Sequence, residues 1–245
     1  MGGRRTRARR RSSVSDLVLG RVADLWRDPV KSMAGQRLEE AEVSWFGVAG
    51  DRRWAFVREG VERSNFPWLT IRERSDMGSY RPRFADPSRP DDSPTLVRTP
   101  AGDELDVVDP ALAAELGQGA RVIKQGHGVF DALPLSLIAT GSVTAVGELV
   151  GRPLDPRRFR PNLLVEAEAF AEDACVGRIL RIGTMRMRVD LLDPRCAVVN
   201  VDPATSERDP AVLRAVAQER DSCLGVYGTP VEPGRVAVGD PVTVE

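Results

Sequence analysis

The sequence contains few of the residues that hold metals or transfer protons, with three cysteines and one histidine among 245 residues. Cys175, Cys196 and Cys223 form no CxxC pair, which excludes a disulfide framework, a four-cysteine zinc site and an iron–sulfur cluster within one chain. His127 lies in a glycine-rich loop, where a structural role is favoured over a catalytic one. No glycine-rich nucleotide-binding fingerprint is present. Any redox reaction of this chain would therefore need electrons from a separate protein.

Long apolar segments are also absent, because the longest candidate, residues 133–150, is interrupted by Pro134 and Glu148. A membrane-spanning helix needs about 18 uninterrupted apolar residues, so we expect no membrane span. Apolar residues make up 42% of the chain and charged residues 29%, the balance of a soluble globular protein. The length suits one large domain or two small ones, and we expect a cytoplasmic protein.

Basic and acidic groups nearly cancel, 35 against 36, but they are unevenly distributed. Residues 1–11 hold six arginines and no acidic residue, so the remaining chain has 29 basic and 36 acidic groups, a net charge of −7. Nucleic-acid binding by the folded body is therefore not indicated. Residues 1–16 are predicted to be a basic, flexible tail. A solvated tail is favoured over one that binds nucleic acid or lipid, and no apolar segment follows to make it a secretory signal.

Short apolar or alternating runs between turn residues predict a chain rich in β-strands. Asp109-Pro110 and Asp209-Pro210 are typical starts of two short helices, and residues 133–150 have the apolar spacing of a third. The expected strands are 21–27, 53–58, 68–72, 95–98, 104–108, 162–166, 178–182, 185–191, 196–201, 224–229, 235–238 and 242–244. The predicted fold class is therefore mainly β with α decorations (α+β), arranged as a barrel or sandwich.

The segment Asp193-Pro194-Arg195-Cys196 is the strongest candidate for chemistry. Cys196 begins an apolar run, and the neighbouring Arg195 guanidinium favours the thiolate form of its side chain. A thiolate is both a nucleophile and a ligand for soft metals. The alternative is a small buried hydrophobic residue in a strand, which is common for a free cysteine. The residues alone leave both interpretations open.

Three further segments place cations in an otherwise acidic body. Lys31, one of only two lysines, stands beside Ser32 after an Asp-Pro turn, which suits a phosphate or a pterin carbonyl. Arg52 belongs to the segment GDRRW and Arg160 to the segment RRFRPN. Taken singly, each segment is better explained as solvated surface. Together they predict anion-binding loops around one thiol.

The chain resembles the MOSC family, named after the C-terminal domain of molybdenum cofactor sulfurase, in seven motifs: PVKS, GDRxW, LTxRE, DxxPLSLI, RFRPN, PRC…VDP and GDPV. These motifs follow the family's order from about Val22 to Val244. The arrangement is similar to that of the mitochondrial amidoxime-reducing component and its bacterial relatives. The resemblance implies a MOSC β-barrel domain at 127–245, preceded by a smaller MOSC N-terminal β-barrel domain at 17–126.

The resemblance also implies a molybdenum cofactor, a molybdenum atom held by a molybdopterin dithiolene and one cysteine of the protein. In this sequence the metal ligand and catalytic residue would be Cys196. The residues that match the family's cofactor-binding positions are Lys31, Ser32, Arg52, Thr140, Ser142, Arg160, Asn162 and Arg195. Relatives often have a cysteine where this chain has Asp193, but that position is not the metal ligand. Pyridoxal phosphate binding is a further property that the resemblance leaves open.

The implied function is an oxidoreductase that reduces small N-hydroxylated compounds with electrons from an external donor protein. A second hypothesis is a molybdopterin-binding or sulfur-carrying protein that uses Cys196 without reductase turnover. A third is an interaction module in which the PRC motif is only structural. The molybdenum content of the purified chain separates the third hypothesis from the first two.

Overall fold

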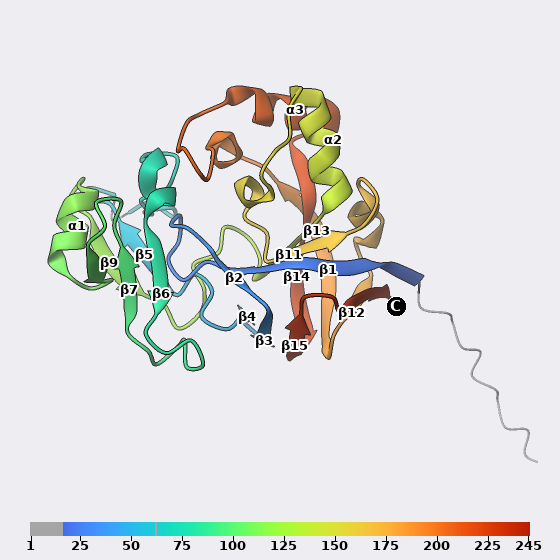
Figure 1. The fold of residues 1–245 in the computed structure, drawn as a ribbon, viewed down its shortest axis with the longest axis horizontal. Coiled ribbons are helices and arrows are strands. Elements are labelled where there is room, and N and C mark those ends of the chain that lie inside the picture. Colours follow the sequence, from blue (N-terminus) through green and yellow to red (C-terminus); the bar gives the residue numbers. More distant parts are fainter. Residues whose placement is uncertain (1–16, 62) are drawn as a thin grey trace, which may run out of the picture.

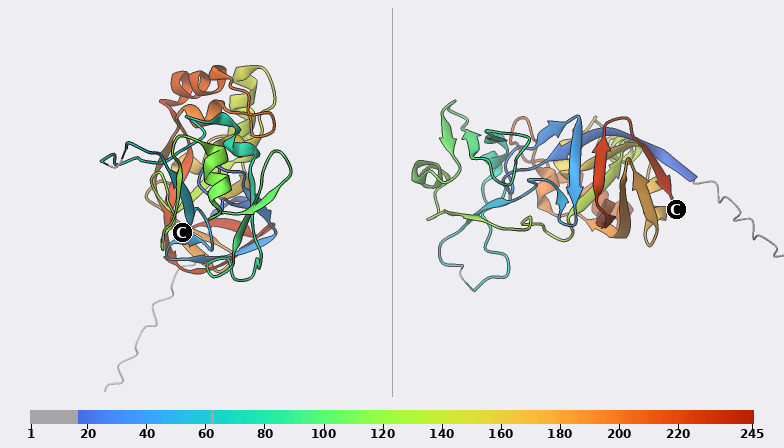
Figure 2. Two further views of the ribbon diagram at one scale, coloured as in Figure 1. Left: turned by 90° about the vertical axis from the view of Figure 1, so that its left-hand side faces the viewer. Right: turned by 90° about the horizontal axis from the view of Figure 1, so that it is seen from below.

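The computed structural model describes residues 17–61 and 63–245, and the predicted tail at 1–16 lies outside them. Within these ranges the chain forms sixteen β-strands and three α-helices, arranged as two lobes that lie side by side (Figures 1 and 2). The predicted mainly β fold with α decorations is confirmed. In the same part of the chain, no helix has both the length and the apolar content required to cross a membrane.

The larger lobe is a closed barrel of seven strands. Its strands, in order around the barrel, are β11 (Leu163–Glu166), β10 (Leu135–Ala139), β14 (Cys223–Glu232), β13 (Met185–Pro194), β12 (Ile179–Ile182), β16 (Pro241–Val244) and β1 (Leu17–Arg27). The β10–β11 pair is parallel and its neighbours are antiparallel. Met185, Met187 and Val189 alternate with more exposed residues along β13 and are fully buried, as the period of two in the sequence predicts.

Strand β1 closes the barrel because it pairs with β11 on one side and β16 on the other. The short strand β2 (Gln36–Leu38) extends this sheet from β1. A second small sheet joins β3 (Glu40–Ser44) to β4 (Gly47–Val48) and to β15 (Gly234–Ala237) from the far end of the chain. The first strand of the predicted N-terminal domain therefore completes the barrel of the predicted C-terminal domain.

The smaller lobe has its own core, which includes Phe56, Met77 and Tyr80. Around this core lie β5 (Trp54–Val57) paired with β9 (Arg121–Lys124), the 3-10 helix η1 (Ser75–Ser79), α1 (Pro110–Leu116), and a sheet of β6 (Arg81–Phe84), β7 (Thr95–Arg98) and β8 (Glu104–Asp106). Val201, from the segment after Cys196, is buried in this core although it follows the barrel strand β13. The segment that carries the candidate thiol thus ties the two lobes together.

Helices α2 (Thr140–Val150) and α3 (Pro210–Arg220) pack against each other at one end of the barrel (Figure 1). Both predicted Asp-Pro helix starts are confirmed, since Asp109 and Asp209 accept hydrogen bonds from Ala111 N and Ala211 N. The remaining 3-10 helices are η2 (Pro156–Phe159), η3 (Ala171–Cys175) and η4 (Ala197–Asn200).

Three predicted elements differ from the structure. Residues 133–150 are predicted as one helix, but Leu135–Ala139 form the fully buried strand β10 and only the rest is α2. A short apolar run buried on both faces has no period, so its spacing alone does not separate strand from helix. Residues 196–201 form η4 rather than a strand, because their apolar side chains face two different cores. Residues 68–72 contribute only an isolated bridge at Trp68.

Candidate functional site

A cavity lies between the two lobes, and its wall is built from segments that are far apart in the sequence. Six of the nine predicted site residues line this first cavity: Lys31, Ser32, Arg52, Arg160, Arg195 and Cys196. The structure therefore brings together the PVKS, GDR, RPN and PRC segments around one space. The predicted cluster of cations beside one thiol is present in the fold.

Cys196 lies where the barrel strand β13 gives way to η4. Its backbone is extended (φ −123°, ψ −176°), and its carbonyl accepts a hydrogen bond from Val199 N at 3.2 Å. Val199 is buried in the core beneath α2 and α3, whereas Cys196 is partly exposed in the wall of the first cavity. The two neighbouring cores hold the turn in place, and the thiol is left open to the cavity.

The other two cysteines have different surroundings. Cys175 is buried and its thiol donates toward Ala171 O at 3.9 Å. Cys223 lies at the start of β14, opposite Pro194. Burial raises the pKa of both thiols, which disfavours the thiolate. Neither cysteine lines the first cavity.

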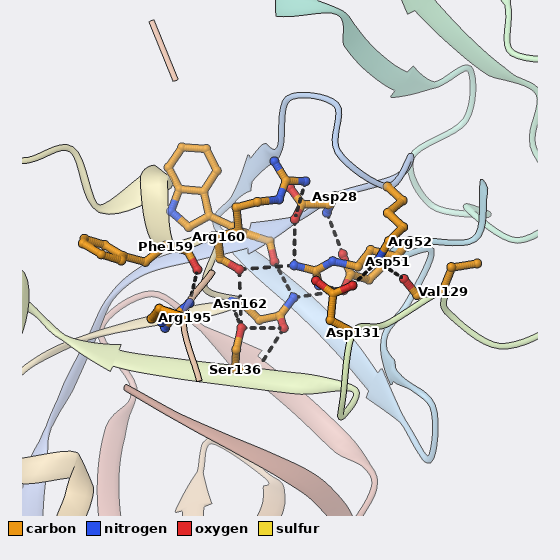
Figure 3. A network of polar contacts seen from close by, with 12 residues as sticks. Asp28, Asp51, Arg52, Val129, Asp131, Ser136, Phe159, Arg160, Asn162 and Arg195 are labelled. Atoms are coloured by element: carbon orange, nitrogen blue, oxygen red, sulfur yellow. Dashed lines mark hydrogen bonds and ion pairs between the residues drawn. The ribbon is translucent and has the colours of Figure 1, made fainter. Parts of the chain in front are cut away.

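Arg52 is the centre of a buried network of charges (Figure 3). Its Nη1 lies 2.5 Å from Asp51 Oδ2, its Nη2 lies 2.9 Å from Asp28 Oδ2, and its Nη2 donates to Arg160 O at 3.2 Å. Burial alone would lower the pKa of Arg52, but the two carboxylates raise it. Burial raises the pKa of Asp51 against the opposing charge of Arg52. The guanidinium is therefore held in a fixed orientation.

Three residues of the cavity wall have backbone in the left-handed region that non-glycine residues rarely adopt. The φ angles are 68° for Ser32, 48° for Arg52 and 50° for Arg160. Such conformations cost on the order of 1 kcal/mol or more each and are concentrated at functional sites. The surrounding hydrogen bonds support them: Arg52 N donates to Asp28 O at 2.6 Å, and Arg160 N donates to Arg157 O at 3.1 Å.

Arg195 is anchored beside the thiol by three groups. Its Nε donates to Leu224 O and its Nη1 to Phe159 O, each at 2.7 Å, and its Nη2 lies 2.8 Å from Asp193 Oδ2. The geometry of that last contact gives no hydrogen bond, so Nη2 retains an unused donor among the described residues. The same holds for Arg160 Nη2, which lies 3.0 Å from Asp28 Oδ2.

Lys31 is buried, and its ammonium group donates to Val129 O at 3.0 Å and to Asp131 Oδ1 at 2.6 Å. Burial lowers the pKa of Lys31, while Asp131 opposes that change. Burial would raise the pKa of Asp131, but the Lys31 ammonium brings it below its usual range. Both side chains line the first cavity.

Several polar residues of this cavity were not among the predicted site residues, including Asp131, Asp193 and Tyr227. Asp193 is 1% exposed, and burial raises its pKa to about 6 in spite of Arg195 and Arg52. Tyr227 lines the same cavity, and burial raises the pKa of its hydroxyl. The sequence analysis named Asp193 in the segment that carries Cys196 but gave it no role, because its burial could not be read from the sequence.

Three predicted cofactor-binding residues are not in the wall of the first cavity: Thr140, Ser142 and Asn162. The Ser142 hydroxyl donates to the buried Glu172 carboxylate at 2.8 Å and accepts from Phe170 N. Thr140 begins α2, and its carbonyl accepts from Thr144 Oγ1. Both residues therefore make their hydrogen bonds around the start of α2, outside the wall of the first cavity.

The Asn162 amide also makes contacts within the protein. Its Nδ2 donates to Asp51 Oδ2 at 3.1 Å and to Trp26 O at 3.3 Å, and its Oδ1 accepts from Ser136 N at 3.1 Å. Asn162 thus holds Asp51, which in turn holds Arg52 (Figure 3). In this structure it acts behind the cavity wall rather than in it.

The donor set of the first cavity fits a metal that brings most of its own ligands. In the part of the chain that the structure describes, no group of three or more His, Cys, Asp or Glu side chains could hold a metal ion. Cys196 supplies one soft sulfur donor. Arg160 and Arg195 each supply an unused N–H donor for an anionic or carbonyl oxygen. These features match a metal with an anionic organic ligand and one protein thiolate.

Comparison with known proteins agrees with this arrangement. The model for the MOSC N-terminal beta barrel domain matches residues 19–113, and the model for the MOSC domain matches residues 124–243. A solved structure of the YuaD protein from Bacillus subtilis has a TM-score of 0.51 at 12% identity, covering 92% of this chain and 94% of its own. That similarity supports the fold.

Curated relatives span most of the chain at low identity. Mitochondrial amidoxime reducing component 2 of Bos taurus is 23% identical, covering 98% of this chain and 87% of its own. Mitochondrial amidoxime-reducing component 1 of Mus musculus is 25% identical with similar coverage, 98% and 86%. Molybdenum cofactor sulfurase of Drosophila grimshawi is 26% identical over 88% of this chain, which matches only 33% of that longer protein. The two domain models and these relatives place the chain in the MOSC family, with a MOSC N-terminal beta barrel domain before its MOSC domain.

Proposed function

We propose that this protein is a molybdenum-cofactor-dependent oxidoreductase that reduces small N-hydroxylated compounds with electrons from a separate donor protein. The observation that carries the proposal is that the partly exposed thiol of Cys196 shares one cavity with Lys31, Arg52, Arg160 and Arg195. The relatives named for amidoxime reduction and for cofactor sulfuration support a role connected with the molybdenum cofactor. The choice of N-hydroxylated substrates rests on the amidoxime-reducing relatives.

In this proposal Cys196 is the protein ligand of molybdenum and the catalytic residue. The bound cofactor would supply two-electron redox chemistry, which the side chains of the protein lack. Lys31, Arg52, Arg160 and Arg195 would neutralise and orient the anionic pterin, with guanidinium forks that suit phosphate and carbonyl oxygens. Ser32 adds a hydroxyl at the same wall. Asn162 would act as a positioning residue through Asp51 and Arg52.

The proposed reaction breaks the N–O bond of the substrate and consumes two electrons and two protons. One proton joins the hydroxyl oxygen, which leaves as water, and the other forms an N–H bond in place of the N–O bond. Asp193 is placed to hold a proton in the cavity that Cys196 lines, because burial raises its pKa to about 6 despite the opposing effect of Arg195. A carboxyl group of this kind can exchange protons near neutral pH.

The proposal is tested by the molybdenum and pterin content of protein made in a molybdopterin-competent host. Cys196→Ala is expected to lose molybdenum while staying folded, because its side chain is partly exposed and its neighbours hold the turn. Cys223→Ala is the matched control and should keep the metal, since Cys223 lies outside the wall of the first cavity. Retention of molybdenum in the Cys196 variant would overturn the assignment of the ligand.

A cofactor-handling protein is the alternative, in which Cys196 carries sulfur or the chain only holds molybdopterin. It is favoured by the similarity to molybdenum cofactor sulfurase over 88% of the chain. It predicts bound pterin or a persulfide on Cys196 without reduction of hydroxylamines by any electron donor. The reductase predicts turnover with a reduced donor protein and none with NADH alone. Mass spectrometry of Cys196 together with a hydroxylamine assay distinguishes the two.

A further inference from the structure

A second cavity of about 400 Å³ adjoins the first and shares Arg158 and Arg160 with it. Its volume is within the range of small-molecule sites, roughly 300–1,000 Å³. One wall is the sheet of β6, β7 and β8 in the smaller lobe, and the opposite wall comes from the barrel lobe, including Trp26 and Pro161. None of the predicted functions assigns a ligand to this space.

The sheet wall places two arginines directly opposite each other. Arg81 on β6 is paired in register with Arg98 on β7, and both side chains are exposed and line the second cavity. Directly opposed residues of an antiparallel pair have their Cβ atoms about 5 Å apart, and like charges in that position are destabilising. Neither guanidinium has an ion pair among the described residues. The fold thus keeps two adjacent cations without a close ion pair in a chain whose body is acidic, with Glu104 on β8 opposite Arg98 as the nearest opposing charge.

The other charges of this cavity are largely paired with one another. Arg83 lies 2.5 Å from Glu104, so the carboxylate that stands opposite Arg98 is shared between the two arginines. Across the cavity, the buried Arg158 lies 2.5 Å from Asp202. Arg158 also has an Nε without a hydrogen bond in the described chain. Because the acids are already occupied, the excess charge of the cavity is positive.

Much of the remaining lining is apolar or aromatic, beside the polar Gln36 and the carboxylate of Asp28, which is paired with arginines. The apolar and aromatic part comes from Trp26, Ile71, Pro82, Pro161, Val198 and Val201. A free inorganic ion would contact only the arginines and would leave this apolar surface exposed to water. A phosphate carried on a flat organic body would use both, since guanidinium groups bind phosphate oxygens and stack on planar rings.

We propose that the second cavity binds an organic phosphate, with its phosphate group between Arg81 and Arg98 and its organic body against Trp26 and the neighbouring prolines. The same chemistry could be supplied by a free phosphorylated metabolite or by a phosphate at the end of a larger cofactor that extends from the first cavity. The site goes beyond the proposed redox function and does not depend on molybdenum.

The test uses the full chain without cofactor and adenosine monophosphate as the probe, with adenosine and inorganic phosphate as partial probes. Adenosine monophosphate at up to about 5 mM should raise the melting temperature, and each partial probe should raise it less. Arg98→Glu and Arg81→Glu should each weaken the binding about tenfold or more. Arg214→Glu is the control with the same charge change, because Arg214 is exposed on α3 and outside both cavities.

Two further measurements guard against a purely structural role for the arginines. Without ligand, Arg81→Gln should melt at the same or a higher temperature, because its repulsion with Arg98 is removed; a clear loss of stability would contradict the proposal. Pterin content of Arg98→Glu, from a competent host, identifies the source of the phosphate: a lowered content indicates the cofactor, and an unchanged content with lost nucleotide binding indicates a separate metabolite. Absence of nucleotide binding together with unchanged pterin content would overturn the site.

Discussion

The two cavities share a wall but hold their cations in opposite ways. In the first cavity Arg52 is 13% exposed and lies between two carboxylates that are 9% exposed or less. In the second, Arg81 and Arg98 are exposed and face each other without a carboxylate between them. A buried cation needs a partner to offset its desolvation, whereas an exposed one is supported by water.

This difference indicates two kinds of recognition. The first cavity has a fixed wall, with three left-handed backbone positions and guanidinium groups oriented by carboxylates and carbonyls. Such a wall suits a resident group that must be held in one geometry. The second cavity has long exposed side chains on a small sheet, which suits a ligand that comes and goes.

Removal of Arg52 should give the largest effect on stability. Arg52→Ala leaves the buried Asp51 and Asp28 without their shared counter-ion, which is expected to cost about 3–5 kcal/mol. The measurement is urea unfolding of the cofactor-free chain at neutral pH. Arg52→Lys is the control. It should lose less stability than the alanine variant, because lysine keeps the positive charge and lacks only the two separate Nη groups that reach both carboxylates. A cost below about 1 kcal/mol for the alanine variant would show that the first cavity's cations are not held by burial.

Asp193 should give an effect of intermediate size that depends on pH. Its pKa is raised to about 6 in the folded chain against 3.8 in the unfolded chain, so between these values only the folded chain keeps the proton. Stability relative to Asp193→Asn should therefore fall as pH rises from about 4 to 6, by on the order of 2 kcal/mol, and stay level above that window. Asp190→Asn, in the same strand but paired with Arg188, is the control. An identical pH profile for wild type and Asp193→Asn would contradict the assignment.

Sequence patterns predicted those strands and helix starts whose conformation depends on residues close together in the chain. The alternation Met185, Met187, Val189 predicted a half-buried strand, and the Asp-Pro pairs at 109–110 and 209–210 predicted helix starts. Motif order was sufficient to nominate Cys196 and the cations that line the first cavity with it. The fold class, and the gathering of these residues around one cavity, were therefore predictable from the sequence.

The rest depends on contacts between distant segments. Pairing of β1 with β16 joins the two ends of the described chain, and no spacing within either strand shows it. Asp131 and Lys31 meet at 2.6 Å although a hundred positions separate them. Ser142 and Asn162 belong to matching motifs, yet Glu172 and Asp51 occupy their polar groups in the fold. Which polar group faces a ligand and which supports the wall is decided by tertiary packing.

The smallest predicted effect separates the paired from the unpaired arginines of the second cavity. Arg83→Gln removes an ion pair with Glu104, so its melting temperature should fall at low salt, whereas Arg81→Gln removes a repulsion and should raise it by about 1 °C. Both differences should vanish near 1 M salt, where the Debye length is about 3 Å. The measurement is a thermal melt of each variant across a salt series. If Arg81→Gln instead lowers the melting temperature at every salt concentration, the Arg81 side chain supports the fold through packing, and the contrast between the two cavities is one of exposure alone.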